Sequence, residues 1–299
     1  MIQHKFTGLG VAMVTPMAAD ESIDFPSLER LTRRLCNSEA DFLVVLGSTG
    51  EAQLLSEEER TAVLDFVLEI SEGAKPIVAG LDVTGGTRVV EERLRTMHVR
   101  GVSGLLVSPP PYVLPSQAGL VDFFQSLDRA TKLPIIAYNV PSRAGVEMSP
   151  ETILEVAHST KNIVAIKQAV PSIEAMRRII NNAPKDFVVL AGDDAWAIPA
   201  IAIGAQGLVS VIGNAFPDMW GRAMDQAVFG QVKDAEDQLR KFDLMLELIF
   251  SEGNPAGIKA LCSHLGLCEA HVRRPLMPVS KDLAQRIYDA VAALDAVPA

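Results

Sequence analysis

Short apolar runs alternate with longer stretches of helical periodicity over most of the chain. Eight of these runs follow a turn signal and are rich in β-branched residues; they cover residues 11–15, 42–46, 76–80, 104–108, 134–138, 163–167, 187–191 and 207–211. Successive runs begin 20 to 34 residues apart, a spacing that fits one strand, one helix and their connections. The pattern therefore predicts eight βα units.

The predicted strands are apolar almost throughout instead of alternating with polar residues. Continuous apolar strands are typical of parallel sheets that are covered on both faces. We therefore expect an α/β fold, a (β/α)8 TIM barrel. A doubly wound open sheet is the competing architecture, since it also alternates strand and helix. Its dinucleotide fingerprint is missing, because Gly47-Ser48-Thr49-Gly50-Glu51 is too short and lacks the third glycine.

The end of the chain carries a purely helical pattern. From about Phe216 onward one helical stretch follows another, with no further strand signal. This tail is longer than an eighth βα unit needs. We expect a catalytic barrel at residues 1–230 and a C-terminal helical extension at residues 231–299. Earlier in the chain, Ser56 followed by Glu59 has the form of a capping box at a helix start.

One uncharged segment, residues 195–216, is long enough to span a bilayer. Pro199, Gly204 and Gly213 divide it into a short helix, a turn and a strand, so we expect no membrane association.

Composition and charge narrow the classes of function. The chain has 299 residues, of which 48% are hydrophobic, and 27 basic against 37 acidic residues give a net charge of −10. A net negative chain repels polyanions, so no nucleic-acid partner is expected. Three cysteines lack metal-ligand spacing and five histidines are scattered, so we expect no metal, no cofactor and no disulfide framework. The first eight residues have no apolar core of a signal peptide, which predicts a cytoplasmic protein.

The chemistry of a barrel enzyme lies at the C-terminal ends of its strands. The sixth predicted strand ends in Lys167. An amine at the end of a buried strand is a candidate nucleophile that forms an imine with a ketone. The alternative is that Lys167 reaches out to solvent or pairs with a carboxylate.

Three other strand ends carry polar groups. The fifth is followed by Tyr138, which can move protons, and by Arg143, whose guanidinium can hold a carboxylate. The second ends in the turn 47–51, where N–H groups and two hydroxyls can converge on a small anion. The fourth is followed by a proline-rich loop with Tyr112. Taken singly, each also has a structural explanation: a core tyrosine, a solvated arginine, a tight turn.

Taken together, these residues resemble the dihydrodipicolinate synthase and N-acetylneuraminate lyase superfamily. The motifs that carry the resemblance are Gly47-Ser48-Thr49-Gly50-Glu51, Tyr138-Asn139-Val140-Pro141-Ser142-Arg143 and Ile166-Lys167. The likeness is close to full length and extends to Val14-Thr15-Pro16, Pro115-Ser116-Gln117, Gly192-Asp193-Asp194, Asn254-Pro255 and Arg274-Pro275-Leu276. The Asn-Val-Pro-Ser-Arg motif is similar to the dihydrodipicolinate synthase branch.

The resemblance implies a class I aldolase in which Lys167 condenses with pyruvate and Ser48 and Thr49 hold its carboxylate. Tyr138 would handle protons, and Arg143 would meet the carboxylate of L-aspartate 4-semialdehyde. The product would be 4-hydroxy-tetrahydrodipicolinate, on the route to diaminopimelate and lysine. The resemblance also assigns Tyr112 to a proton relay in a neighbouring subunit of a homotetramer. It places further substrate-binding positions at Gly47, Gly192 and Val209.

Two other functions stay open at this point. The chain can be another pyruvate-dependent aldolase, an N-acetylneuraminate or 2-keto-3-deoxy sugar acid lyase, or a non-catalytic barrel that senses a keto acid. The relay threonine of the branch is replaced by Ser48, and Gln168 stands where Glu is usual. The positions that bind inhibitory lysine in sensitive relatives correspond to Ala52, Glu57, Arg60, Thr84, Arg88 and Pro111, so we expect weak inhibition by lysine or none.

Overall fold

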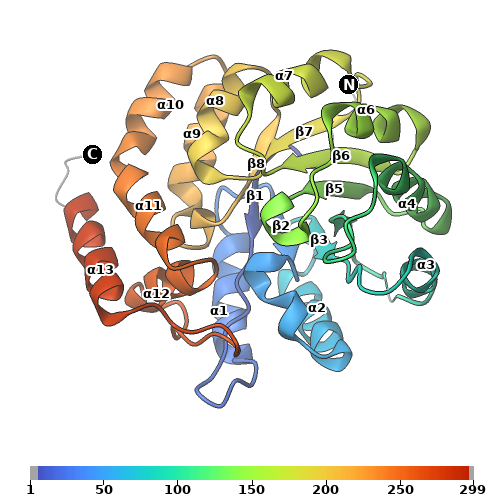
Figure 1. Cartoon of the computed structure of the whole chain (residues 1–299). Coiled ribbons are helices and arrows are strands. Elements are labelled where there is room, and N and C mark those ends of the chain that lie inside the picture. The colour runs from blue at the N-terminus through green and yellow to red at the C-terminus, as the bar shows by residue number, and fades with distance from the viewer. Residues whose placement is uncertain (1–5, 98, 296–299) are drawn as a thin grey trace.

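The computed structural model describes residues 6–97 and 99–295. Eight parallel strands close into a barrel in the order β1 to β8, and helices surround it (Figure 1). This confirms the predicted (β/α)8 barrel. The strands are β1 (Gly8–Ala12), β2 (Phe42–Val45), β3 (Ile77–Gly80), β4 (Gly104–Val107), β5 (Ile135–Asn139), β6 (Ile163–Gln168), β7 (Val188–Ala191) and β8 (Gly207–Ser210).

A helix of the outer layer follows each strand. These helices are α1 (Phe25–Cys36), α2 (Glu57–Ser71), α3 (Thr87–Thr96), α4 (Gln117–Ala130), α6 (Pro150–Ser159), α7 (Ile173–Asn182), α8 (Ala197–Ala202) and α9 (Pro217–Val228). Shorter turns connect some strands to them, namely η1 (Ser48–Gly50), η2 (Ala52–Leu54), α5 (Pro141–Ala144), η3 (Asp194–Trp196) and η4 (Ile212–Asn214). The predicted capping box is confirmed, because Ser56 and Glu59 exchange both hydrogen bonds at the start of α2.

The tail adds four helices on one side of the barrel (Figure 1). They are α10 (Val232–Leu239), α11 (Asp243–Ser251), α12 (Ala256–His264) and α13 (Lys281–Asp295), with the turn η5 (Arg240–Phe242) before α11. The uncharged segment 195–216 is broken into η3, α8, β8 and η4, as its proline and glycines predicted. Across residues 6–97 and 99–295, no helix has the length and apolar character needed to cross a membrane.

Both faces of the strands are buried. Successive residues point alternately into the barrel interior and into the layer between the barrel and the helices. On β2, Phe42 and Val44 belong to the cluster that fills the barrel, whereas Leu43 and Val45 pack in the cluster between barrel and helices. The same alternation on β6 places Ala165 inside the barrel. Side chains two residues apart on a strand share a face, so the backbone directs the residue two positions after Ala165 towards the barrel interior. That residue is Lys167.

The first strand was predicted three residues too late, at 11–15 instead of Gly8–Ala12. Met13 still donates its N–H to Val44 at 2.9 Å, but the segment then leaves the ladder. Val14 donates its N–H to the Asn214 side chain at 3.0 Å, and the Thr15 hydroxyl donates to the Gly50 carbonyl at 2.7 Å. Side-chain hydrogen bonds thus replace strand pairing here. The other seven predicted strands agree with the observed ones to within one residue.

Two expectations fall outside the described residues. The absence of a signal peptide was argued in part from residues 1–5, and two of the five scattered histidines are His4 and His98.

Candidate active site

A cavity of about 280 Å³ opens at the C-terminal ends of strands β2 to β5. This is the end of a barrel at which reactive groups are expected. The cavity brings four predicted site residues together: Gly47, Ser48, Tyr138 and Arg143. The tail adds Asn254, Pro255 and Leu276 to its lining.

Lys167 is 3% exposed, on β6. Its Cα lies opposite that of Tyr138 on β5. The Lys167 Nζ lies 4.4 Å from the centroid of the Tyr138 ring, a distance at which an ammonium interacts favourably with the ring face. Within the described part of the chain, no carboxylate forms an ion pair with this amine. The alternative that Lys167 is a solvated or ion-paired lysine is therefore wrong.

Tyr138 connects the amine to the cavity. Its side chain is buried, packs in the cluster that fills the barrel, and lines the cavity, whereas Lys167 itself is not among the lining residues. The phenol is therefore in contact with both the amine and the space where a substrate would lie. This arrangement suits a group that moves protons beside an imine.

The turn after β2 is a short 3-10 helix between two left-handed residues. Leu46 has φ 61° and Glu51 has φ 57°, and Ser48, Thr49 and Gly50 form η1 between them. The first N–H groups of such a turn have no partner within it, so they can donate to an anion. Ser48 lines the cavity, while Thr49 is buried and accepts a hydrogen bond from the Asn254 side chain at 2.9 Å.

Arg143 comes from α5, the short helix that begins with Pro141 directly after β5. Its guanidinium lines the cavity and donates a hydrogen bond to the Asn254 carbonyl at 2.9 Å. The residue is exposed, and among the described residues its guanidinium bonds Asn254 alone, so other N–H groups of its five are available for a ligand. Asn254 therefore links Arg143 to Thr49, two candidate substrate-binding groups on different strands' loops.

Three predicted site residues lie elsewhere. Tyr112 is 94% exposed, has φ 74°, and does not line the cavity of its own chain. Gly192 follows β7, where a Cβ would lie 2.9 Å from that of Ala169, so close approach of the chain explains a glycine here. Val209 is buried inside the barrel on β8, in the same cluster as Tyr138.

A buried carboxylate, that of Asp194, joins the ends of β7 and β8. Asp194 accepts hydrogen bonds from the Ser210 hydroxyl at 2.5 Å and from the N–H groups of Val211 and Ile212 at 2.9 and 3.4 Å. Burial raises the pKa of Asp194 from 3.8 to about 6, and the hydrogen bonds from Ser210 and Val211 oppose the rise only in part. The sequence pattern had given Asp194 no role of its own.

Asn254 and Lys259 are further residues that the strand-end argument missed. Both belong to the tail, and both bind the turn after β2, Asn254 through Thr49 and Lys259 through Glu51. One feature of the sequence could have indicated Lys259: it is the single charged residue among the first seven residues of α12.

Comparison with known proteins places these features in a family. The chain matches the Dihydrodipicolinate synthetase family over residues 5–294. It is 41% identical over 278 residues to the 4-hydroxy-tetrahydrodipicolinate synthase of Phocaeicola vulgatus, and the match covers 93% of each chain.

Solved structures give the same result. The dihydrodipicolinate synthase of Thermotoga maritima is similar with a TM-score of 0.93 and 32% identity, covering 97% of this chain and 99% of that one. The dihydrodipicolinate synthase of Acinetobacter baumannii, solved in complex with pyruvate, is similar with a TM-score of 0.92 and 30% identity, again covering 97% and 99%.

Proposed function

The chain belongs to the dihydrodipicolinate synthetase family, and on this premise we propose that it condenses pyruvate with L-aspartate 4-semialdehyde through a Schiff base on Lys167. The product is 4-hydroxy-tetrahydrodipicolinate, and the enzyme serves lysine and diaminopimelate biosynthesis. The observation that carries the proposal is the buried Lys167 amine on the ring of Tyr138, which lines the cavity beside the turn after β2.

The first half-reaction binds pyruvate covalently. The Ser48 and Thr49 turn receives the pyruvate carboxylate, which directs the keto carbon towards Lys167. The amine adds to this carbon, and loss of water gives the imine. Tyr138 lies against the amine and can supply the proton that the departing hydroxyl needs. Loss of a methyl proton then gives the nucleophilic enamine.

The second half-reaction forms the ring. The enamine attacks the aldehyde carbon of the semialdehyde while Arg143 holds the carboxylate of that substrate. The amino group of the semialdehyde then adds to the imine carbon and displaces Lys167, which restores the free enzyme. One water is lost overall, in the first half-reaction, and the hydroxyl on the new ring comes from the aldehyde oxygen.

We further propose a homotetramer of paired dimers in the cytoplasm. Tyr112 supports this assembly, because a tyrosine that is 94% exposed and does not line the active-site cavity of its own chain is free to enter the site of a neighbour. There it would complete a proton relay with Ser48 and Tyr138. Similarly, we propose that residues 1–230 form the catalytic barrel and residues 231–299 the appended extension, since α9 ends at Val228 and α10 begins at Val232.

The findings favour the synthase over a sugar acid lyase of the superfamily, because the relatives and solved structures described above are synthases. Product formation tests this choice directly. Purified enzyme with pyruvate should consume L-aspartate 4-semialdehyde, whereas cleavage of N-acetylneuraminate or of a 2-keto-3-deoxy sugar acid at a higher kcat/KM would contradict the proposal.

Borohydride trapping tests the covalent step. Incubation with pyruvate and borohydride should add one reduced adduct per chain, located at Lys167 by peptide mass spectrometry. The Lys167→Ala variant should form no adduct. Lys161→Ala is a matched control, because Lys161 is exposed just before the same strand. An adduct that persists in Lys167→Ala would remove Lys167 from the mechanism.

A further inference from the structure

Glu51 is a buried carboxylate immediately after the turn that we propose binds pyruvate. It is 3% exposed and adopts a left-handed backbone conformation, with φ 57° and ψ 26°. This conformation is unfavourable for residues with a Cβ and persists where the surroundings determine it. Its N–H donates to the Ser48 carbonyl at 3.2 Å, which closes η1. The conformation of Glu51 and the shape of the turn are therefore coupled.

Lys259 on α12 is the partner of this carboxylate. Its Nζ forms an ion pair and hydrogen bond with Glu51 Oε1, and both side chains are fully buried. The same ammonium donates to the His271 carbonyl at 2.8 Å. Burial lowers the pKa of Lys259, and the charge of Glu51 opposes that change. The pair joins positions 208 residues apart, the barrel mouth and the C-terminal extension.

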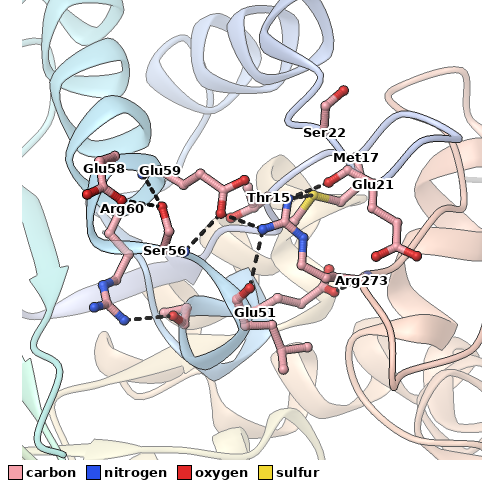
Figure 2. A network of polar contacts seen from close by, with 12 residues as sticks. Thr15, Met17, Glu21, Ser22, Glu51, Ser56, Glu58, Glu59, Arg60 and Arg273 are labelled. Carbon is pink, nitrogen blue, oxygen red and sulfur yellow. Dashed lines mark hydrogen bonds and ion pairs between the residues drawn. The ribbon is translucent and has the colours of Figure 1, made fainter.

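Arg273 supports the other carboxylate oxygen. Its backbone N–H donates to Glu51 Oε2 at 2.7 Å, and its guanidinium bonds Glu59 at 2.5 Å and the Leu54 carbonyl at 3.2 Å. Figure 2 shows Arg273 between Glu51 and Glu59. A second guanidinium nitrogen bonds the carbonyl of Glu21, in the loop after β1. Both oxygens of Glu51 are thus held by groups from the tail.

Stability alone explains this pair poorly. Removing two charges from water costs free energy, and replacing a buried ion pair with apolar side chains often leaves a protein equally or more stable. A buried pair is better suited to selecting one conformation among several. Here the selected conformation is that of a residue directly joined to the turn 48–50.

We propose that Glu51 and Lys259 are positioning residues that hold the turn after β2 in the conformation that binds the pyruvate carboxylate. This inference rests on the proposed function. Asn254 acts in the same direction from the same part of the chain, since its side chain donates to the Thr49 hydroxyl at 2.9 Å. The C-terminal extension therefore fixes the turn at two points, Thr49 and Glu51.

Two variants at this pair test the inference. Glu51→Asp keeps both charges but shortens the carboxylate by one methylene, so that it cannot reach both Lys259 and the Arg273 N–H. The double variant Glu51→Gln/Lys259→Met leaves no unpaired buried charge. If the turn moves by about 1 Å, the KM for pyruvate should rise, and the rate of borohydride trapping at low pyruvate should fall, by about tenfold to a hundredfold. The KM for the semialdehyde, which Arg143 binds, should change much less.

The matched control is Glu151→Gln/Arg178→Met, which removes an exposed ion pair between α6 and α7. It should bind and trap pyruvate as the wild type does. A lowered melting temperature in the Glu51 and Lys259 variants, with an unchanged KM for pyruvate and trapping rate, would assign the pair a purely structural role and overturn the inference. Glu51→Asp keeps both charges at this site, so it decides the question where the double variant fails to fold.

Trapping with the wild-type enzyme distinguishes a failure of the proposed function from a failure of the positioning role. If wild-type enzyme forms no pyruvate adduct, the proposed function has failed. If it forms the adduct and both variants form it equally fast, only the positioning role has failed.

Discussion

Asp194 makes a specific prediction about stability and pH. The carboxyl is fully buried at the end of β7, and burial raises its pKa to about 6, compared with 3.8 for an unperturbed aspartate. Below pH 3.8 the group is protonated in both the folded and the unfolded chain. Between these pKa values the folded chain keeps a proton that the unfolded chain has lost, so stability falls as pH rises. Above about pH 6 both states are ionised, and the contribution levels off.

The size of the effect follows from the same two values. A carboxyl whose pKa lies at about 6 instead of 3.8 lowers the free energy of unfolding by about 3 kcal/mol once it is ionised. In a chain of this size about 2 °C of melting temperature corresponds to each kcal/mol, which predicts a change of about 6 °C.

Asp194→Asn isolates this group from all others that titrate in the same range. Asparagine can still accept from the N–H groups of Val211 and Ile212, which now bond the carboxylate. Thermal or denaturant unfolding of both proteins from pH 4 to pH 7.5 gives their difference in stability at each pH. We expect the wild type to lose about 2.4 kcal/mol relative to the variant across this range, because part of the loss has already occurred at pH 4. A difference that stays constant, or that changes in favour of the wild type at high pH, would refute the reasoning.

Three further predictions concern substrate and effector binding. Arg143→Ala should lower kcat/KM for the semialdehyde by roughly ten- to hundredfold, the loss of one charged hydrogen-bonded contact, with little change in pyruvate trapping; equal losses for both would indicate a structural arginine. Tyr112→Phe should lower kcat by roughly 10²-fold or more, while the variant still forms the pyruvate adduct on Lys167. A normal kcat in this variant would show that Tyr112 takes no part in the proton relay. L-Lysine should inhibit weakly or not at all, because the family resemblance implies a carboxylate in sensitive relatives at the position of Arg88. Half-inhibition at submillimolar lysine would contradict this prediction.

The sequence predicts the barrel well because each strand is buried on both faces and so leaves a continuous apolar run. The first strand is the exception, and glycine is the reason. A Cβ on Gly10 would lie 2.3 Å from the ring of Phe42, which fills the barrel from β2. The strand therefore needs a residue that carries no apolar signal and has low strand propensity. The apolar residues Met13 and Val14 follow the strand directly, so the apolar pattern placed the predicted strand three residues too far towards the C-terminus.

The catalytic side of the site was predictable for a related reason. Lys167 and Tyr138 stand at strand ends, so the fold alone determines that they lie close to each other. Asn254, in the turn before α12, and Lys259, on α12, reach the turn after β2 from the tail, whose packing on the barrel follows no strand period that the sequence pattern can reveal. The exposure of Tyr112 was also beyond the sequence, since it depends on the course of the proline-rich loop.

The bond between Glu51 and Lys259 also orders events during the synthesis of the chain. All eight strands leave the ribosome before Lys259 does, because the last of them, β8, ends at Ser210. The barrel can therefore close around Lys167 before Lys259 and Arg273, the two residues that hold the carboxylate of Glu51, have been synthesised. A nascent or prematurely terminated chain would have Lys167 in place inside the barrel. Its turn after β2, however, would not yet be held in the conformation that binds the pyruvate carboxylate. Synthesis of residues 211–273 would then separate a closed barrel from a competent enzyme.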